Sequence, residues 1–413
     1  MKPDRNPDHW RDAYLRLHPR AVLKHLEQPY VYHAGQDELY EIDQRALDFL
    51  SQCNGTRTGK DLTDEGEFVR YCLEEGILDA LDAPDPVDVA VDRSANPSLR
   101  YLELHLLHKC NLRCRHCYLG ALLPAEIALA DATHIVRQFS AGGGLRLLIS
   151  GGEPLLYRDL KSFLVQTRGL NIRRVLFSNG TLINDKNIGW LDVDEIQFSL
   201  DGWDRGHEML RGEGTFAPTM AGIRAARAAG IPISFSTMVH RGNLDEFDRM
   251  QAFIRETGAV EWGIDMMAAT GSLTQSPDLA VPWETAAPFL EYAYGGGHHG
   301  SSDGYACGRH LMAVMPDGQA VKCGFYRDQS LGDARSSLNE CWLKMPHIPL
   351  DRLECRNCPA LNECRGGCRF RAPHLLAPDP AMCCVYGMQK ETTNPPSTWE
   401  GNKNQGGRRD ENH

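Results

Sequence analysis

The stretch KCNLRCRHCY, residues 109–118, places Cys110, Cys114 and Cys117 in CxxxCxxC spacing. Four protein ligands close a structural zinc site or complete the usual four-iron cluster. Three thiolates on a 4Fe–4S cluster leave one iron open to a chelating molecule. The motif follows an apolar, strand-like run, YLELHLL, at residues 101–107. We therefore expect it on a loop after the C-terminal end of a strand, where barrels of alternating strands and helices place their chemistry.

CxxxCxxC followed by an aromatic residue, here Tyr118, resembles the signature of the radical S-adenosylmethionine (SAM) superfamily. A second resemblance is the run ISGGEP, which contains Gly151, Gly152, Glu153 and Pro154 at the end of another strand candidate. In that family the amino and carboxylate groups of SAM chelate the open iron. An electron from the cluster then cleaves SAM into methionine and a 5′-deoxyadenosyl radical, which takes a hydrogen atom from the substrate.

The resemblance implies roles for particular residues. The SAM-cleaving cluster would be held by Cys110, Cys114 and Cys117, and Gly151 to Pro154 would seat the methionine end of SAM. The Glu153 carboxylate would take the SAM ammonium, and Arg211 would pair with the SAM carboxylate. Other cofactor contacts are implied at later strand ends, at Ser178, Asn179, Ser199 and Asp201. Each of these, like Arg211, could instead cap a helix or satisfy a turn.

The chain has 413 residues, a net charge of −11 and 14 cysteines. It has no concentrated basic stripe, which argues against a nucleic-acid partner. No apolar run reaches membrane-spanning length, and the polar N-terminus lacks the apolar core of a signal peptide. We therefore expect a cytoplasmic protein. In a reducing compartment, clustered cysteines bind metal or serve catalysis more often than they form disulfides.

The middle of the chain alternates between strand and helix patterns. Strand candidates are 101–107, 146–152, 173–180, 194–202, 232–240 and 261–266. One intervening helix is predicted to begin at an Asn243 cap and to end at Gly258. The pattern predicts an α/β fold with a partial (β/α)6 barrel. We divide the chain into an N-terminal domain with linker (1–95), the barrel (96–300), a cysteine-rich domain (301–390) and a disordered tail (391–413).

The cysteine-rich domain contains a second constellation. Cys307 and Cys323 flank a predicted hairpin, LMAVM and QAVKC, that turns at Gly318. This region is similar to the seven-cysteine SPASM extension of radical SAM peptide-modifying enzymes, which carries two auxiliary iron–sulfur clusters. The resemblance assigns a proximal cluster to Cys307, Cys323 and Cys368. It assigns a distal cluster to Cys355, Cys358, Cys364 and either Cys383 or Cys384, so three clusters are expected in all.

Two departures from the family pattern bear on the chemistry. Some members have a further proximal cysteine where this chain has Ser301, so the proximal cluster would have an open iron unless Cys341 or another group fills it. Such an iron could hold a substrate thiolate. Sulfatase-maturing relatives have an aspartate, their proposed base, directly after the second cysteine. This chain has Gly324 after Cys323, which disfavours a sulfatase-maturing role. The alternative for the cysteines is structural zinc, whereas Cys53 and Cys72 are expected to be small buried hydrophobes.

The N-terminal region pairs a predicted hairpin (29–43) with two amphipathic helix candidates, 45–53 and 66–81. This winged-helix-like outline resembles the PqqD-like peptide-recognition element over about residues 25–85. In that family a leader peptide adds as a strand at the sheet edge, and fusion to the enzyme raises the effective concentration of the peptide. The acidic composition disfavours DNA as the ligand.

Together these features predict a radical SAM enzyme that modifies a ribosomally made precursor peptide, forming a thioether or a carbon–carbon or carbon–oxygen crosslink. Its electron donor would be a flavodoxin or ferredoxin. Two alternatives are a maturase of a whole protein or of a small cofactor precursor, and an iron–sulfur or zinc scaffold that binds peptides without turnover.

Overall fold

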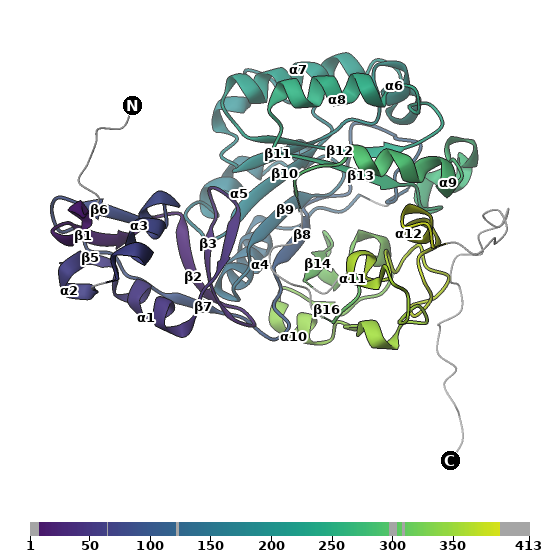
Figure 1. The fold of residues 1–413 in the computed structure, drawn as a ribbon. Helices are drawn as coiled ribbons and strands as arrows, with labels where there is room; N and C mark the ends of the chain where they lie inside the picture. Colours follow the sequence, from purple (N-terminus) through teal and green to yellow (C-terminus); the bar gives the residue numbers. More distant parts are fainter. Residues whose placement is uncertain (1–7, 64, 121–123, 297–303, 308–309, 389–413) are drawn as a thin grey trace.

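The computed structural model describes residues 8–63, 65–120, 124–296, 304–307 and 310–388 (Figure 1). The tail predicted for 391–413 and the departure at Ser301 lie outside these residues. Over the described part of the chain, none of the helices combines the length and apolarity that a bilayer crossing requires.

The central sheet is built from six parallel strands that are neighbours in chain order. They are β8 (Tyr101–His105), β9 (Arg146–Ser150), β10 (Arg173–Ser178), β11 (Glu195–Ser199), β12 (Ile233–Val239) and β13 (Glu261–Met266). Each predicted strand is present, a few residues shorter at most. This confirms the α/β class and the partial, barrel-like parallel sheet.

The connecting helices cover the outside of this sheet, with α7 and α8 lying over β11 and β12 in Figure 1. They are α4 (Leu129–Ala141), α5 (Leu160–Gln166), α6 (Arg205–Arg211), α7 (Phe216–Ala228) and α8 (Phe247–Thr257). Their apolar faces and the strands share one buried core that includes Phe139, Phe198 and Phe235.

The predicted start of α8 is wrong, although its end is confirmed. Gly258 adopts a φ of +70° at the C-cap, as a helix-ending glycine does. Asn243 does not cap the helix, because its amide donates to the carbonyls of Asp201 (2.8 Å) and Met238 (2.9 Å). A buried side chain with two such acceptors is fixed inside the loop after β12, so the helix begins four residues later, at Phe247.

The C-terminal part extends the barrel sheet. β14 (Leu311–Val314) pairs in parallel with β8, and β15 (Gln319–Val321) and β16 (Gly332–Asp333) follow antiparallel, as the predicted hairpin requires. Short helices complete the region: α9 (Trp283–Ala286), α10 (Leu338–Leu343), α11 (Leu361–Cys364) and α12 (Pro380–Val385). The cysteine-rich segment is therefore held next to the first barrel strand.

The N-terminal part contains two small sheets. One has the order β4-β3-β2-β7, from β2 (Ala21–His25), β3 (Pro29–His33), β4 (Glu38–Glu41) and β7 (Val91–Arg93). The other has the order β5-β1-β6, from β1 (Tyr14–Leu17), β5 (Asn54–Thr58) and β6 (Leu78–Leu81). Helices α1 (Gln44–Gln52), α2 (Gly59–Leu62) and α3 (Gly66–Glu74) accompany them.

The predicted 29–43 hairpin is confirmed as β3 and β4. The predicted 66–81 helix is too long: α3 stops at Glu74, Gly76 takes a φ of +67°, and the remaining residues form β6. Residues 91–93 of the expected linker form β7, which pairs with β2. Cys53 and Cys72 are both 0% exposed, as small buried hydrophobes should be.

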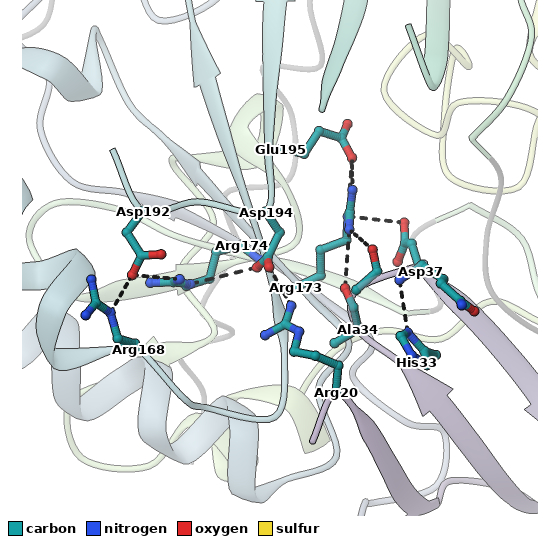
Figure 2. A network of polar contacts seen from close by, with 12 residues as sticks. Arg20, His33, Ala34, Asp37, Arg168, Arg173, Arg174, Asp192, Asp194 and Glu195 are labelled. Atoms are coloured by element: carbon teal, nitrogen blue, oxygen red, sulfur yellow. Dashed lines mark hydrogen bonds and ion pairs between the residues drawn. The ribbon is translucent and has the colours of Figure 1, made fainter. Parts of the chain in front are cut away.

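A network of buried ion pairs fixes the N-terminal part to the barrel (Figure 2). Arg173, the first residue of β10, binds Glu195 at 2.8 Å and the carbonyls of Ala34 (3.2 Å) and Gly35 (3.1 Å) in the β3–β4 turn. Asp37 in that turn pairs with Arg146 and lies 3.6 Å from Arg173. These arginines begin their strands, so the N-terminal part sits at the N-terminal ends of the barrel strands.

Replacing Asp37 with alanine should lower the free energy of unfolding by about 3 kcal/mol, because removing one partner leaves buried charge without compensation. The side chains of Asp37 and Arg173 are 11% and 5% exposed. The urea midpoint measures the loss. The control is Asp245→Ala, whose pair with Arg205 is 73% and 62% exposed and should matter by less than about 1 kcal/mol. Equal losses in both variants would contradict the prediction.

Candidate functional site

The CxxxCxxC loop follows β8 and lines a cavity of about 920 Å³ at the C-terminal ends of the barrel strands. Parallel strands end at the same edge of the sheet, which brings residues from distant parts of the sequence together. The sequence-predicted residues in the cavity wall are Cys110, Cys114, Cys117, Tyr118, Gly151, Gly152, Ser178, Asn179, Ser199 and Arg211. Three predicted contacts, Glu153, Pro154 and Asp201, are absent from the residues that line this cavity.

The glycine pair after β9 lies directly beneath the cysteine loop. The Gly152 amide donates to the Leu107 carbonyl at 2.7 Å, and the Glu153 amide donates to the Lys109 carbonyl at 2.9 Å. A Cβ on Gly152 would lie 2.2 Å from the Lys109 oxygen, and Gly151 has a φ of +134°. Only residues without a side chain permit this approach, so the pair sets the position of the loop that carries Cys110.

Glu153 does not point into the cavity, which corrects its expected role as the ligand of the SAM ammonium. Its carboxylate accepts from the Ser178 hydroxyl (2.9 Å), the Asn179 amide (2.9 Å) and the Leu155 amide (3.2 Å). The side chain is fully buried, and burial raises the pKa of Glu153 to about 7. Glu153 therefore ties the Gly-Gly turn to the end of β10. Pro154 is buried and begins a short 3-10 turn.

Asp201 is also a supporting residue rather than a cofactor contact. It is 1% exposed, and its Oδ2 accepts from Nε of Arg211 at 2.5 Å. Burial opposes ionisation, but the neighbouring Arg211 and His116 outweigh it and lower the pKa of Asp201 to about 2. The aspartate thus holds Arg211 in the cavity wall, where Nη1 lies 4.0 Å from the Cys114 Sγ.

The thiols of the loop have donors beside them. Burial raises the pKa of Cys114 to about 11, and Arg211 opposes that rise. The Asn179 side-chain amide lies 4.0 Å from the Cys110 Sγ and donates to Asn111 at 3.0 Å. A thiolate bound to a metal gains from such donors, which stabilise its charge.

A second cavity, of about 260 Å³, lies behind Tyr118. Cys307, Cys323 and Cys368 line it together, which is the grouping that the sequence assigned to a proximal cluster. Glu103 and Tyr118 line both cavities and so form a shared wall. The Tyr118 hydroxyl donates to Glu103 at 3.4 Å.

The shared wall explains Gly324. A Cβ at this position would lie 2.7 Å from the Tyr118 ring, and that ring also packs against Phe325 with centroids 5.1 Å apart. An aspartate after Cys323 would collide with this ring unless the ring moved. Glu103 of β8 supplies a carboxylate to the lining of both cavities.

Cys383 and Cys384 have different surroundings in the structure. Cys383 is an electrostatic neighbour of Cys355, Cys358 and Cys364. Cys384 lines a different cavity of about 470 Å³, together with Glu284 and Leu290. Cys341 is 2% exposed and belongs to the main hydrophobic core.

Two lining residues, Glu103 and Lys322, were not among the predicted site residues. Each is a charged residue in a mostly apolar strand run, YLELHLL or QAVKC, and that interruption was the available signal. Within the described part of the chain, no three His, Cys, Asp or Glu side chains converge on one ion-sized point. The thiols of the two cavities are spread along the cavity walls instead.

Comparison with known proteins agrees with this geometry. The Radical SAM superfamily matches residues 104–254. An AdoMet-dependent heme synthase from Oleidesulfovibrio alaskensis is 27% identical over 72% of this chain and 89% of its own length. A PqqA peptide cyclase from Gluconobacter oxydans is 28% identical over 65% of this chain and 85% of its own length.

The fold is also similar to a solved structure. Streptococcus suis SuiB bound to precursor peptide SuiA superposes with a TM-score of 0.65 and 16% identity, covering 89% of this chain and 99% of SuiB. The cysteine loop, the Gly-Gly-Glu-Pro turn and the parallel sheet that joins them all lie within or beside the matched region. The chain therefore contains a radical SAM domain over residues 104–254.

Proposed function

We propose that this enzyme uses SAM to modify a ribosomally made precursor peptide by radical chemistry. The observation that carries the proposal is the pair of three-cysteine cavities that share Glu103 and Tyr118 as a wall. A substrate side chain at this wall would lie between two metal centres. The similarity to a PqqA peptide cyclase, and to a SuiB structure that holds its precursor peptide, supports a peptide as that substrate.

The donor sets fit iron–sulfur clusters. Cys110, Cys114 and Cys117 would hold the SAM-binding cluster; the auxiliary sets are Cys307, Cys323 and Cys368, and Cys355, Cys358, Cys364 and Cys383. Thiolate-only sets with donors beside the sulfurs are typical of such sites. When bound, the first cluster and SAM would supply the 5′-deoxyadenosyl radical.

The protein residues around the first cavity bind and orient. Arg211, held by Asp201, offers a cation to the SAM carboxylate and to the Cys114 sulfur. Ser178, Asn179 and Ser199 place polar side chains at the strand ends in the same wall. The volume of about 920 Å³ is at the upper end for small-molecule sites, which leaves room for a peptide side chain beside the cofactor.

The N-terminal domain, residues 1–95, would bind the leader of the precursor as a PqqD-like element. Strand β4 is at the edge of its sheet, as β-strand addition requires. Beside it lies a cavity of about 590 Å³ with an apolar floor that includes Phe49 and Phe68. The lining also includes four acidic side chains and one cation, Arg45, which pairs with one of them, Glu65; the other three are Glu41, Asp43 and Asp48. This surface would select a leader with apolar anchors and basic neighbours.

The other parts complete the proposed organisation. Residues 96–300 form the radical SAM core and 301–390 the SPASM-type domain, and the enzyme works in the cytoplasm with a flavodoxin or ferredoxin as electron donor. A second candidate is a small cofactor precursor as the substrate, which the similarity to an AdoMet-dependent heme synthase favours.

The test is anaerobic reconstitution with iron and sulfide, followed by dithionite, SAM and a short peptide encoded beside the gene. We expect about twelve irons per chain, as three four-iron clusters require, formation of 5′-deoxyadenosine, and a peptide that has lost two hydrogen atoms by mass spectrometry. Deoxyadenosine with an unchanged peptide and a converted porphyrin would favour the second candidate. Stoichiometric zinc without deoxyadenosine would refute both.

A further inference from the structure

Lys322 extends from the end of β15 into the cavity lined by Cys307, Cys323 and Cys368. Its side chain is 6% exposed, and among the described residues its Nζ has no hydrogen-bond partner. The ammonium lies over the Tyr326 ring, 5.3 Å from the centroid. A cation–π contact stabilises an ammonium, but it supplies no hydrogen-bond acceptor for the N–H groups.

A buried ammonium without a hydrogen-bond acceptor is unusual, because desolvation costs several kcal/mol unless an anion compensates it. The chain contains a direct contrast. Lys24 is 0% exposed, and its Nζ pairs with Asp92 at 3.1 Å. The compensating partner of Lys322 must therefore be sought inside the cavity.

The charges around the cavity show which partner fits. Its lining includes two cations, Lys322 and Arg369, and one carboxylate, Glu103. The carboxylate is already engaged by His105 at 2.8 Å and by Tyr118. Arg369 donates to the backbone carbonyls of Ala377 (2.7 Å) and Leu375 (3.1 Å). With Lys322 protonated, the lining carries two cations against one carboxylate, and three thiolates bound to a metal would supply the missing negative charge.

We propose that Lys322 donates to the sulfurs of an iron–sulfur cluster held by Cys307, Cys323 and Cys368, balances its charge and raises its reduction potential. The inference rests on the proposed function, which places a cluster in this cavity. Net charge and hydrogen bonds to the sulfurs set the potentials of such clusters. A fixed positive charge favours the reduced form, which carries one more electron. Lys322 touches no substrate in this scheme and acts through the cluster.

The experiment is a redox titration of the full-length reconstituted protein, followed by electron paramagnetic resonance. The proximal signal is identified by its loss in Cys307→Ala. Lys322→Met keeps the length of the side chain and removes its charge, whereas Lys322→Arg keeps the charge. Lys24→Met is the matched control for loss of a buried lysine. Iron per chain and deoxyadenosine formed without peptide are measured on the same samples.

We expect a more negative proximal midpoint in Lys322→Met, and unchanged midpoints in Lys322→Arg and Lys24→Met. Loss of the proximal iron in Lys322→Met alone would also support charge balance. A wild-type midpoint in Lys322→Met with its iron retained would overturn the inference and leave the proposed function standing. If Cys307→Ala binds as much iron as the wild type, these three cysteines hold no cluster, and the inference is overturned.

Discussion

The Cys114→Ala variant, reconstituted with iron and sulfide, should bind about four fewer irons per chain and form no detectable 5′-deoxyadenosine. Cys114 is the middle one of the three cysteines in the loop sequence, and Nη1 of Arg211 is 4.0 Å from its sulfur. With one thiolate gone, two remain to hold a cluster that already lacks a fourth protein ligand. The measurement pairs iron analysis with chromatography of the nucleoside product, and circular dichroism checks that the fold is intact.

Two other cysteines provide the controls. Cys384→Ala should retain the iron content and the deoxyadenosine yield, because Cys384 lines a separate cavity. Cys383→Ala should lower the iron content and leave deoxyadenosine formation measurable, because Cys383 neighbours the distal set. Deoxyadenosine at the wild-type rate in Cys114→Ala would refute the assignment of the SAM-binding cluster.

Gly152→Ala should have an effect nearly as large, although it adds a single methyl group. The new Cβ would lie 2.2 Å from the Lys109 oxygen and 2.6 Å from that of His108. Backbone oxygens cannot relieve this clash by a change of rotamer, so the cysteine loop must move away from the end of β9. We expect a loss of about 2 kcal/mol in the free energy of unfolding, as overpacking typically causes, with deoxyadenosine formation close to background.

The matched control for this variant is Gly189→Ala, because a Cβ at Gly189 meets no atom within 4 Å. It should keep the urea midpoint, the iron content and the rate of SAM cleavage. A Gly152→Ala protein with full iron content and wild-type SAM cleavage would show that the glycine pair does not position the loop.

The sequence predicted the barrel strands because each is a short run rich in apolar residues and helix patterns lie between them. The cysteine groupings came from the resemblance to the SPASM extension and stay a prediction, although Cys307, Cys323 and Cys368 do line one cavity. The roles of Glu153 and Asp201 could not be predicted in the same way. Strand-end position brings a carboxylate to the correct edge of the sheet, but its direction depends on donors from other elements, here the Asn179 amide after β10 and the Arg211 guanidinium of α6.

Contacts between segments that are far apart in the sequence were the second feature that could not be predicted. The strand β6 lies inside what the spacing predicted as a helix, and its partner β1 is more than sixty residues earlier in the chain. The choice between Cys383 and Cys384 was likewise a matter of direction. Adjacent residues of a helix point about 100° apart, so only one of the two can face the distal set from α12, and the docking of α12 decides which.

The attachment of the N-terminal part to the N-terminal ends of the strands has a consequence for any precursor gene. The seven residues of β12 span roughly 23 Å at about 3.3 Å per residue, and the cysteine loop lies beyond the far end. An extended chain covers at most about 3.6 Å per residue. If the N-terminal domain binds the leader as proposed, the peptide needs a spacer of at least about seven residues before its modified side chain. Open reading frames near the gene can be sorted by that spacer length before any peptide is synthesised.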